Sequence, residues 1–168
     1  MNLKALALAG EDHRHWYTKA YAKIERVCGA HGWNVERFIA ILAITSPRVP
    51  VSRNWALTLA YMADGSTNGM LPNVIAGLAH YEKGGEIRGR KTGAFARALL
   101  GDTRAIVLDV WISRALRVPQ KEFTGPRYDS HAARIARLAK RLGWTPVETQ
   151  AALWAGIMRA HNNTPREF

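Results

Sequence analysis

Lys91 and Asp109 are the two residues whose types and spacing best suit covalent chemistry. They lie 18 residues apart, and an apolar stretch that ends in Ile106-Val107-Leu108 precedes the aspartate. A neutral amine is a nucleophile, and a carboxylate can activate it or stabilise the positive charge that develops on a sugar. The alternative interpretation is that Lys91 only contacts a phosphate and Asp109 only caps a helix.

The elements that must position this pair are predicted to be helices, because the apolar spacing is helical almost throughout. We predict an all-α fold of about eight helices in a single domain, residues 1–168. The expected helices are Glu11–His31, one capped by Asn34, one from Ser52, one capped by Asn73 and reaching Tyr81, one opening near Lys91, Asp109–Leu116, Asp129–Leu142, and one opening with a capping box at Thr145. Ile106-Val107-Leu108 is interpreted as a buried connection. Lys91 and Asp109 then each stand at the start of a helix.

The charge of the chain favours an acidic partner. Its formal net charge is +11, and residues 85–168 hold 15 basic and seven acidic residues. Such an excess is typical of proteins that neutralise nucleic-acid phosphates, although an anionic membrane or solubility alone would also account for it. In the helix Asp129–Leu142, Arg134, Arg137 and Arg141 share one face, which either contacts phosphate or is simply solvated.

The remaining composition excludes several kinds of site. A single cysteine, Cys28, allows no internal disulfide and no multi-cysteine metal or iron–sulfur site, so we expect no metal and no cofactor. The first ten residues are apolar but too short for a membrane span and lack the flank of a signal peptide. We therefore expect a cytoplasmic protein with no membrane partner, and a monomer.

The sequence around Lys91 and Asp109 resembles that of a known family. Residues 89–92, Gly-Arg-Lys-Thr, are followed 18 residues after the lysine by Leu108-Asp109. This arrangement is similar to that of the helix-hairpin-helix-GPD superfamily of DNA base-excision glycosylases. Within that superfamily, the local sequence resembles that of endonuclease III. The segment Leu42 to Ser46, followed by Asn54, also resembles a helix end, a DNA-probing loop and the next helix of that superfamily. The likeness covers roughly residues 34–116, about half of the chain.

The resemblance implies a compact helical fold that binds double-stranded DNA and turns one modified or damaged nucleotide into a pocket. Lys91 would be the nucleophile of a DNA glycosylase, with or without AP lyase activity, and Asp109 the activating carboxylate. The residues that the resemblance places toward DNA are Arg48, Asn54, Arg88, Gly89, Arg90 and Thr92. The basic helix face, Arg134, Arg137 and Arg141, is expected to contact DNA as well. Trp111 and Ser46 would lie at the base pocket.

The chain departs from the family pattern at the hairpin and at the probing loop. Residues 85–89 read Gly-Glu-Ile-Arg-Gly where the family usually has Leu-Pro-Gly-Val-Gly, so one glycine is missing and Glu86 lies near the phosphate site. The glutamine that often fills the vacated base stack is absent, and Arg48 could replace it. Two alternatives therefore remain open. One is a phage-type enzyme that alters a base without releasing it, and the other is a DNA-binding module without catalysis.

Overall fold

A computed structural model of the chain describes residues 2–168, in which all the regular elements are helices. In chain order they are α1 (Leu3–Ala9), η1 (Glu11–His13), α2 (Trp16–His31), α3 (Val35–Thr45), α4 (Val51–Asp64), α5 (Pro72–Glu82), α6 (Arg90–Leu99), α7 (Val110–Leu116), η2 (Gln120–Glu122), α8 (Gly125–Leu142) and α9 (Pro146–Ala160), where η marks a 3₁₀ turn. The predicted all-α class is confirmed. None of the helices in the described part of the chain is long and apolar enough to cross a membrane.

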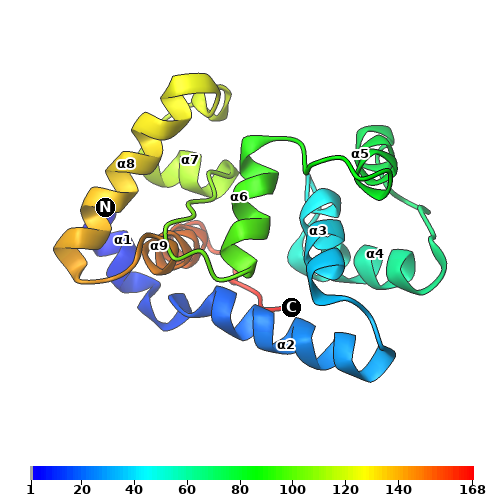
Figure 1. The fold of residues 1–168 in the computed structure, drawn as a ribbon. Coiled ribbons are helices and arrows are strands. Elements are labelled where there is room, and N and C mark those ends of the chain that lie inside the picture. Colours follow the sequence, from blue (N-terminus) through cyan, green and yellow to red (C-terminus); the bar gives the residue numbers. More distant parts are fainter. Residues whose placement is uncertain (1) are drawn as a thin grey trace.

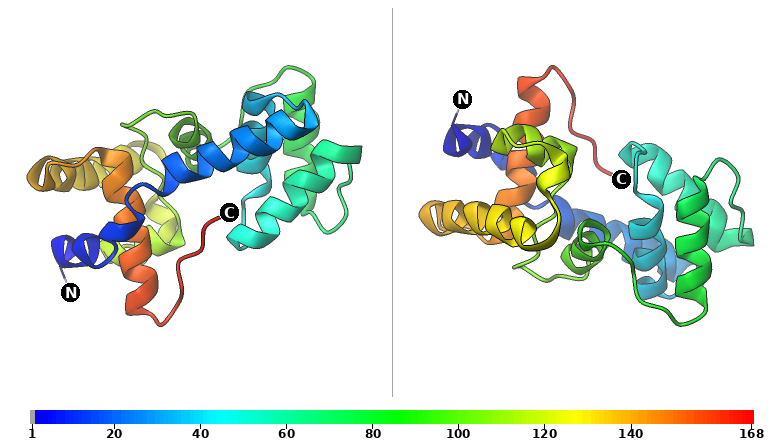
Figure 2. Two further views of the ribbon diagram at one scale, coloured as in Figure 1. Left: turned by 90° about the horizontal axis from the view of Figure 1, so that it is seen from below. Right: turned by 90° about the horizontal axis from the view of Figure 1, so that it is seen from above.

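The helices divide into two groups that pack around separate cores. The first core contains Ile24, Phe38 and Leu78 and is built mainly by α2, α3, α5 and α6. The second contains Ile112 and Leu153 and is built mainly by α1, α7, α8 and α9. Figure 1 shows α3, α4 and α5 on one side, α1, α7, α8 and α9 on the other, and α6 between them, with α2 running along both groups. The views in Figure 2 show the same division.

Three of the predicted helix starts are confirmed by their capping hydrogen bonds. The side chain of Asn34 accepts from the backbone N–H of Arg37 at 2.8 Å. Asp109 caps α7, and Thr145 forms a capping box at the start of α9. These caps were predictable because each side chain bonds to backbone only three residues away.

Two predicted caps are wrong. Helix α5 begins at Pro72 rather than after Asn73, and α8 begins at Gly125 rather than at Asp129. Both helices have a proline in the first turn, where the missing N–H needs no partner, so each starts earlier than its polar residue suggests. Asp129 lies inside α8, where it forms an ion pair with Arg90.

The N-terminal region also differs from the prediction, which had one helix over Glu11–His31. Instead, η1 and α2 are separate, and α1 was not predicted, so residues 2–168 hold nine α-helices rather than about eight. The break between η1 and α2 is stabilised by a contact with a distant helix. Both carboxylate oxygens of Asp12 accept hydrogen bonds from the Arg159 guanidinium, at 2.8 and 2.6 Å. That contact ties η1 to the end of α9, which no local pattern reveals.

Helix α1 crosses α9 at very short range, and two glycines permit it. A Cβ atom at Gly10 would lie 2.1 Å from the carbonyl oxygen of Ala152, and one at Gly156 would lie 1.9 Å from that of Leu6. Only residues without a side chain fit at these two positions. The crossing fixes α9, whose other face lines the site described next.

Candidate functional site

A cavity of about 1180 Å³ lies where segments of both helical groups meet. Several segments build its walls: Ser46, residues 48–51 and Asn54; Lys91 and Phe95 on α6; Val107 and residues 109–111; Gln120 and Lys121; one face of α9; Trp16 and Tyr17 on α2; and most residues of the segment 162–168. Segments far apart in the chain therefore build one site. The last of them, residues 162–168, is called the cavity strap below.

Lys91 and Asp109 both line this cavity. Lys91 is in the first turn of α6, and Asp109 caps α7 by accepting the backbone N–H of Ile112 at 2.8 Å. Burial raises the pKa of the Asp109 carboxyl, while the Ile112 hydrogen bond and the positive charge of Lys91 act in the opposite direction. Among the ion pairs of residues 2–168, none joins Lys91 to a carboxylate. The amine is thus close enough to affect Asp109 and is not neutralised by direct contact.

Four further residues of the predicted site, Ser46, Arg48, Asn54 and Trp111, also line the cavity. Arg48 has a backbone φ of 61°, a left-handed conformation that is uncommon for a residue with a side chain. Asn54 is only 3% exposed, and its Oδ1 accepts the Thr45 hydroxyl at 2.7 Å, so it belongs to the wall itself. The Arg114 guanidinium stacks 4.3 Å from the Trp111 ring centroid.

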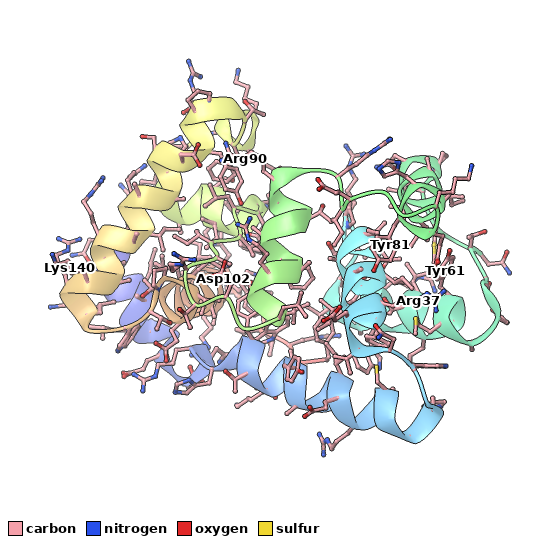
Figure 3. The ribbon with its side chains drawn as sticks, in the orientation of Figure 1. Arg37, Tyr61, Tyr81, Arg90, Asp102 and Lys140 are labelled. Atoms are coloured by element: carbon pink, nitrogen blue, oxygen red, sulfur yellow. The ribbon has the colours of Figure 1, made fainter. Side chains whose placement is uncertain are left out.

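The other residues that were predicted to contact DNA do not line this cavity: Arg88, Gly89, Arg90, Thr92, Arg134, Arg137 and Arg141. Arg88 bonds to the His80 ring at 3.0 Å. Arg90, which is labelled in Figure 3, pairs with Asp129 of α8 and lies over the Tyr128 ring, so it joins α6 to α8. Arg137 and Arg141 are exposed on α8. Their contact with DNA stays a prediction about the surface around the cavity.

A buried pair in the cavity wall was missed by the sequence analysis. The Tyr17 hydroxyl donates to Oε1 of Gln150 at 2.8 Å, and Gln150 is 3% exposed. Burial and the negative charge of Asp109 raise the pKa of Tyr17, so this pair lies close to the carboxylate. Because Tyr17 occupies the amide oxygen, the amide NH₂ of Gln150 is the end left to donate. The two residues are 133 positions apart, and no local signal joins them.

Aromatic side chains form much of the remaining wall. The Trp16 ring lies 6.3 Å from Phe95, 6.0 Å from Trp154 and 5.0 Å from Phe168, measured between ring centroids. Aromatic faces of this kind stack on nucleobases without regard to base identity. Trp16, Phe95 and Trp154 lie on helices, whose spacing does not distinguish a core position from a cavity position, and Phe168 follows the last helix.

The charged side chains of the cavity are mostly positive. Arg48, Lys91, Lys121 and Arg166 line it, against the single carboxylate of Asp109. None of these four cations takes part in an ion pair of the described residues. A concave site with unpaired cations attracts anionic ligands, and phosphate groups are the usual ones.

Fold and site together define an all-α protein with a large, cation-lined cavity between two groups of helices. The chain belongs to a family of unknown function, DUF7178, whose profile matches residues 4–162. Comparisons with curated proteins and with solved structures give no match. The matched range spans both helical groups and the residues that line the cavity as far as Asn162, whereas residues 163–168 of the cavity strap lie outside it.

Proposed function

We propose that this protein is a DNA-acting enzyme that draws one modified or damaged nucleotide into the cavity and attacks it with Lys91. The observation that carries the proposal is that Lys91 and Asp109 line the same cavity, among aromatic walls and unpaired cations. Two helices joined by a short connection, α5 and α6, suit the helix-hairpin-helix resemblance, and Lys91 lies at the start of the second of them. Double-stranded DNA is the proposed partner, because the cations suit its phosphates and the aromatic faces suit an extruded base.

The proposed reaction begins when Asp109 takes a proton from the Lys91 ammonium group, which leaves a neutral amine. The amine nitrogen then forms a bond to C1′ of the sugar as the glycosidic bond breaks, and the base leaves with that electron pair and gains a proton. The nitrogen loses a proton and O4′ gains one as the C1′–O4′ bond breaks, so the sugar ring opens to a Schiff base. Loss of a proton from C2′ then expels the 3′ phosphate by β-elimination. Water finally hydrolyses the Schiff base and restores the amine. The raised pKa of Asp109 makes it a stronger base than an exposed aspartate.

The experiment is borohydride trapping on duplexes that contain uracil, an oxidised base or a hypermodified base. We expect a covalent protein–DNA adduct with the preferred duplex, and no adduct with Lys91→Gln or Asp109→Asn. Lys121→Gln is the matched control, because Lys121 lines the same cavity without a role in the reaction. It should weaken binding yet keep the adduct. If no duplex in the panel gives an adduct or a released base, the glycosylase and lyase proposal is wrong.

The size of the cavity favours a second candidate on the same site, a base-modifying enzyme. Its 1180 Å³ exceeds the roughly 300–1,000 Å³ that is typical of sites for drug-sized ligands, so a plain base would leave much of it unfilled. A base with a bulky substituent fits this space better, and the reaction would then exchange that substituent. Mass spectrometry of the nucleosides separates the two, since this candidate alters the base without releasing it. Binding with no chemical change would instead identify a DNA-binding module.

A further inference from the structure

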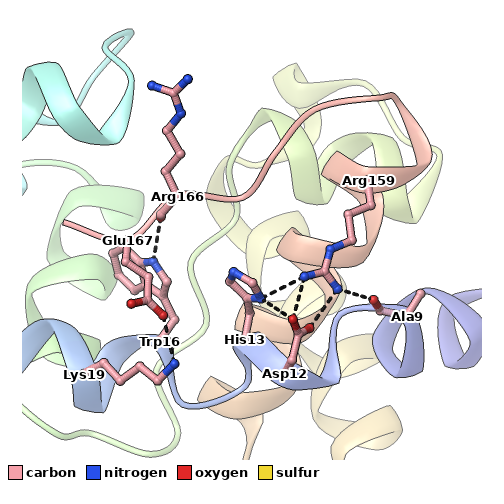
Figure 4. Close-up of polar contacts among 8 residues, drawn as sticks. All are labelled: Ala9, Asp12, His13, Trp16, Lys19, Arg159, Arg166 and Glu167. Carbon is pink, nitrogen blue, oxygen red and sulfur yellow. Dashed lines mark hydrogen bonds and ion pairs between the residues drawn. The ribbon is translucent and has the colours of Figure 1, made fainter.

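The cavity strap, residues 162–168, joins the two helical groups and is fixed at three points. The indole N–H of Trp16 donates to the backbone carbonyl of Arg166 at 3.0 Å, and Lys19 pairs with Glu167 at 2.9 Å (Figure 4). The Phe168 ring lies 5.0 Å from Trp16 and 5.3 Å from Trp55, between ring centroids. Trp16 belongs to α2 and Trp55 to α4, so the aromatic ring of Phe168 sets the position of the strap against both helices.

The strap leaves the Arg166 guanidinium without a protein partner. The backbone carbonyl of Arg166 is held by Trp16, whereas none of the hydrogen bonds or ion pairs in residues 2–168 uses its side chain. Figure 4 shows this side chain extending away from Trp16 with no dashed contact. Arg166 nevertheless lines the cavity. The backbone is therefore fixed while the charged group stays available.

Another arginine in the same view behaves differently. The guanidinium of Arg159 donates to Asp12, to the backbone carbonyl of Ala9 at 2.6 Å, and contacts the His13 ring at 3.2 Å (Figure 4). Its donors are used to hold η1 against α9. The contrast shows that an arginine near the end of the chain can find protein partners, and that Arg166 is placed where it has none.

We propose that Arg166 binds a phosphate of the DNA strand whose nucleotide enters the cavity, and that Phe168 is a positioning residue that holds the strap for this contact. The proposal rests on the proposed function for its DNA partner. A guanidinium suits this role because its planar donors match two phosphate oxygens at once. It adds a contact from the end of the chain, outside the helix-hairpin-helix segment.

The experiment measures binding of a short duplex with one abasic-site analogue over a range of salt concentrations. Affinity falls as the salt concentration rises, and each phosphate contact makes the slope of log affinity against log salt steeper by about 0.9. We expect Arg166→Gln to lower affinity about tenfold, the size of one charge-assisted contact, and to reduce the slope by about 0.9. Arg166→Lys should restore the slope and part of the affinity. Arg26→Gln, the same charge change at an exposed position of α2, should leave the slope unchanged.

A cycle of single and double variants separates the phosphate contact of Arg166 from the positioning role of Phe168. Phe168→Ala should reproduce most of the loss while it retains the arginine, and Phe168→Trp should restore binding by refilling the aromatic contact. The variant with both Arg166→Gln and Phe168→Ala should bind no more weakly than Arg166→Gln alone. Full affinity in Phe168→Ala would refute the positioning role, and an unchanged slope in Arg166→Gln would refute the phosphate contact.

These measurements distinguish failure of the Arg166 phosphate contact from failure of the proposed function. If wild-type protein gives neither adduct nor altered base but Arg166→Gln still lowers the salt slope, the chemistry is wrong and the phosphate contact is supported. If adducts form and the Arg166→Gln slope matches wild type, the phosphate contact alone is wrong. Absence of any salt-dependent binding by wild-type protein would overturn both.

Discussion

Asp109 caps α7 and lines the cavity, so its observed role as a cap can be separated by experiment from its proposed role as a base. Capping requires only an oxygen that accepts the Ile112 N–H, which an asparagine also has. The proposed chemistry requires a group that can take a proton. Replacing Asp109 by asparagine therefore removes the second role and keeps the first.

The pH dependence of stability should reveal the buried carboxyl. Because burial raises the pKa of Asp109, the folded chain holds this proton more tightly than the unfolded chain does. The carboxyl therefore lowers the free energy of unfolding as pH rises from the ordinary aspartate range through the raised pKa. Asp109→Asn should gain stability relative to wild type over that window, as measured by urea unfolding at a series of pH values. A constant difference between the two proteins across the window would contradict this.

The same shift predicts how activity changes with pH. The proposed base works only as a carboxylate, so the rate of adduct formation should rise with pH through the raised pKa of Asp109. The midpoint of this rise should lie above the value of an ordinary aspartate. Trapping yields from single-turnover reactions at several pH values measure it. A rate that is already maximal in the ordinary aspartate range would be inconsistent with Asp109 as the base.

At the residue scale, sequence predicts local features and misses those that depend on packing. Lys91 at a helix start and Asp109 as a cap were predictable because such features are encoded within a few residues. Gln150, Tyr17 and Arg166 were missed because their place in the cavity depends on partners that are far away in the chain. A buried glutamine on an alanine-rich helix has the same local pattern whether it faces a cavity or a core.

Among the elements, α9 is the one on which the site most depends, because it supplies Gln150 and Trp154 and is crossed by α1. Sequence predicts its start from the capping box at Thr145. It does not predict the crossing, since α1 was not expected and a glycine inside a helix usually lowers its stability. Position 156 requires glycine because the carbonyl of Leu6 on the crossing helix α1 occupies the space that a Cβ would need.

Gly156→Ala should therefore destabilise the protein, although alanine is the better helix former. The added Cβ would lie 1.9 Å from the Leu6 carbonyl oxygen, so α1 must move away from α9. We expect a loss of about 1–3 kcal/mol, which is typical of overpacking in a close-packed interior. Thermal unfolding followed by circular dichroism measures it. Gly29→Ala is the control, since a Cβ there meets nothing within 4 Å, and it should be neutral or stabilising.

Over the whole molecule, the two helical groups are tied together by elements that belong to both. Trp154 of α9 packs against both hydrophobic cores, and Trp16 contacts α9 while it also holds the cavity strap. The all-α class followed from helical periodicity alone. The division into two groups did not, because apolar spacing shows that a helix has a buried face without showing which core receives it.

We expect the two groups to unfold together despite their separate cores. The shared contacts of Trp154 and Trp16 mean that loss of one core exposes part of the other. Urea unfolding followed by tryptophan fluorescence and by circular dichroism should give coincident single transitions. Two separated midpoints would show instead that each group is stable alone and that the cavity is an interface between independent units.

Cys28, the only cysteine of the chain, has a useful consequence. It is 0% exposed within the first core, and burial raises the pKa of its thiol, which disfavours the reactive thiolate. A thiol introduced at Thr164, which is exposed at the edge of the cavity, would therefore be the one that maleimide reagents reach in the folded protein. A spin label or fluorophore could be attached there without first removing the native cysteine. Spectroscopy on such a labelled protein would test whether residues 162–168 respond to the proposed DNA partner.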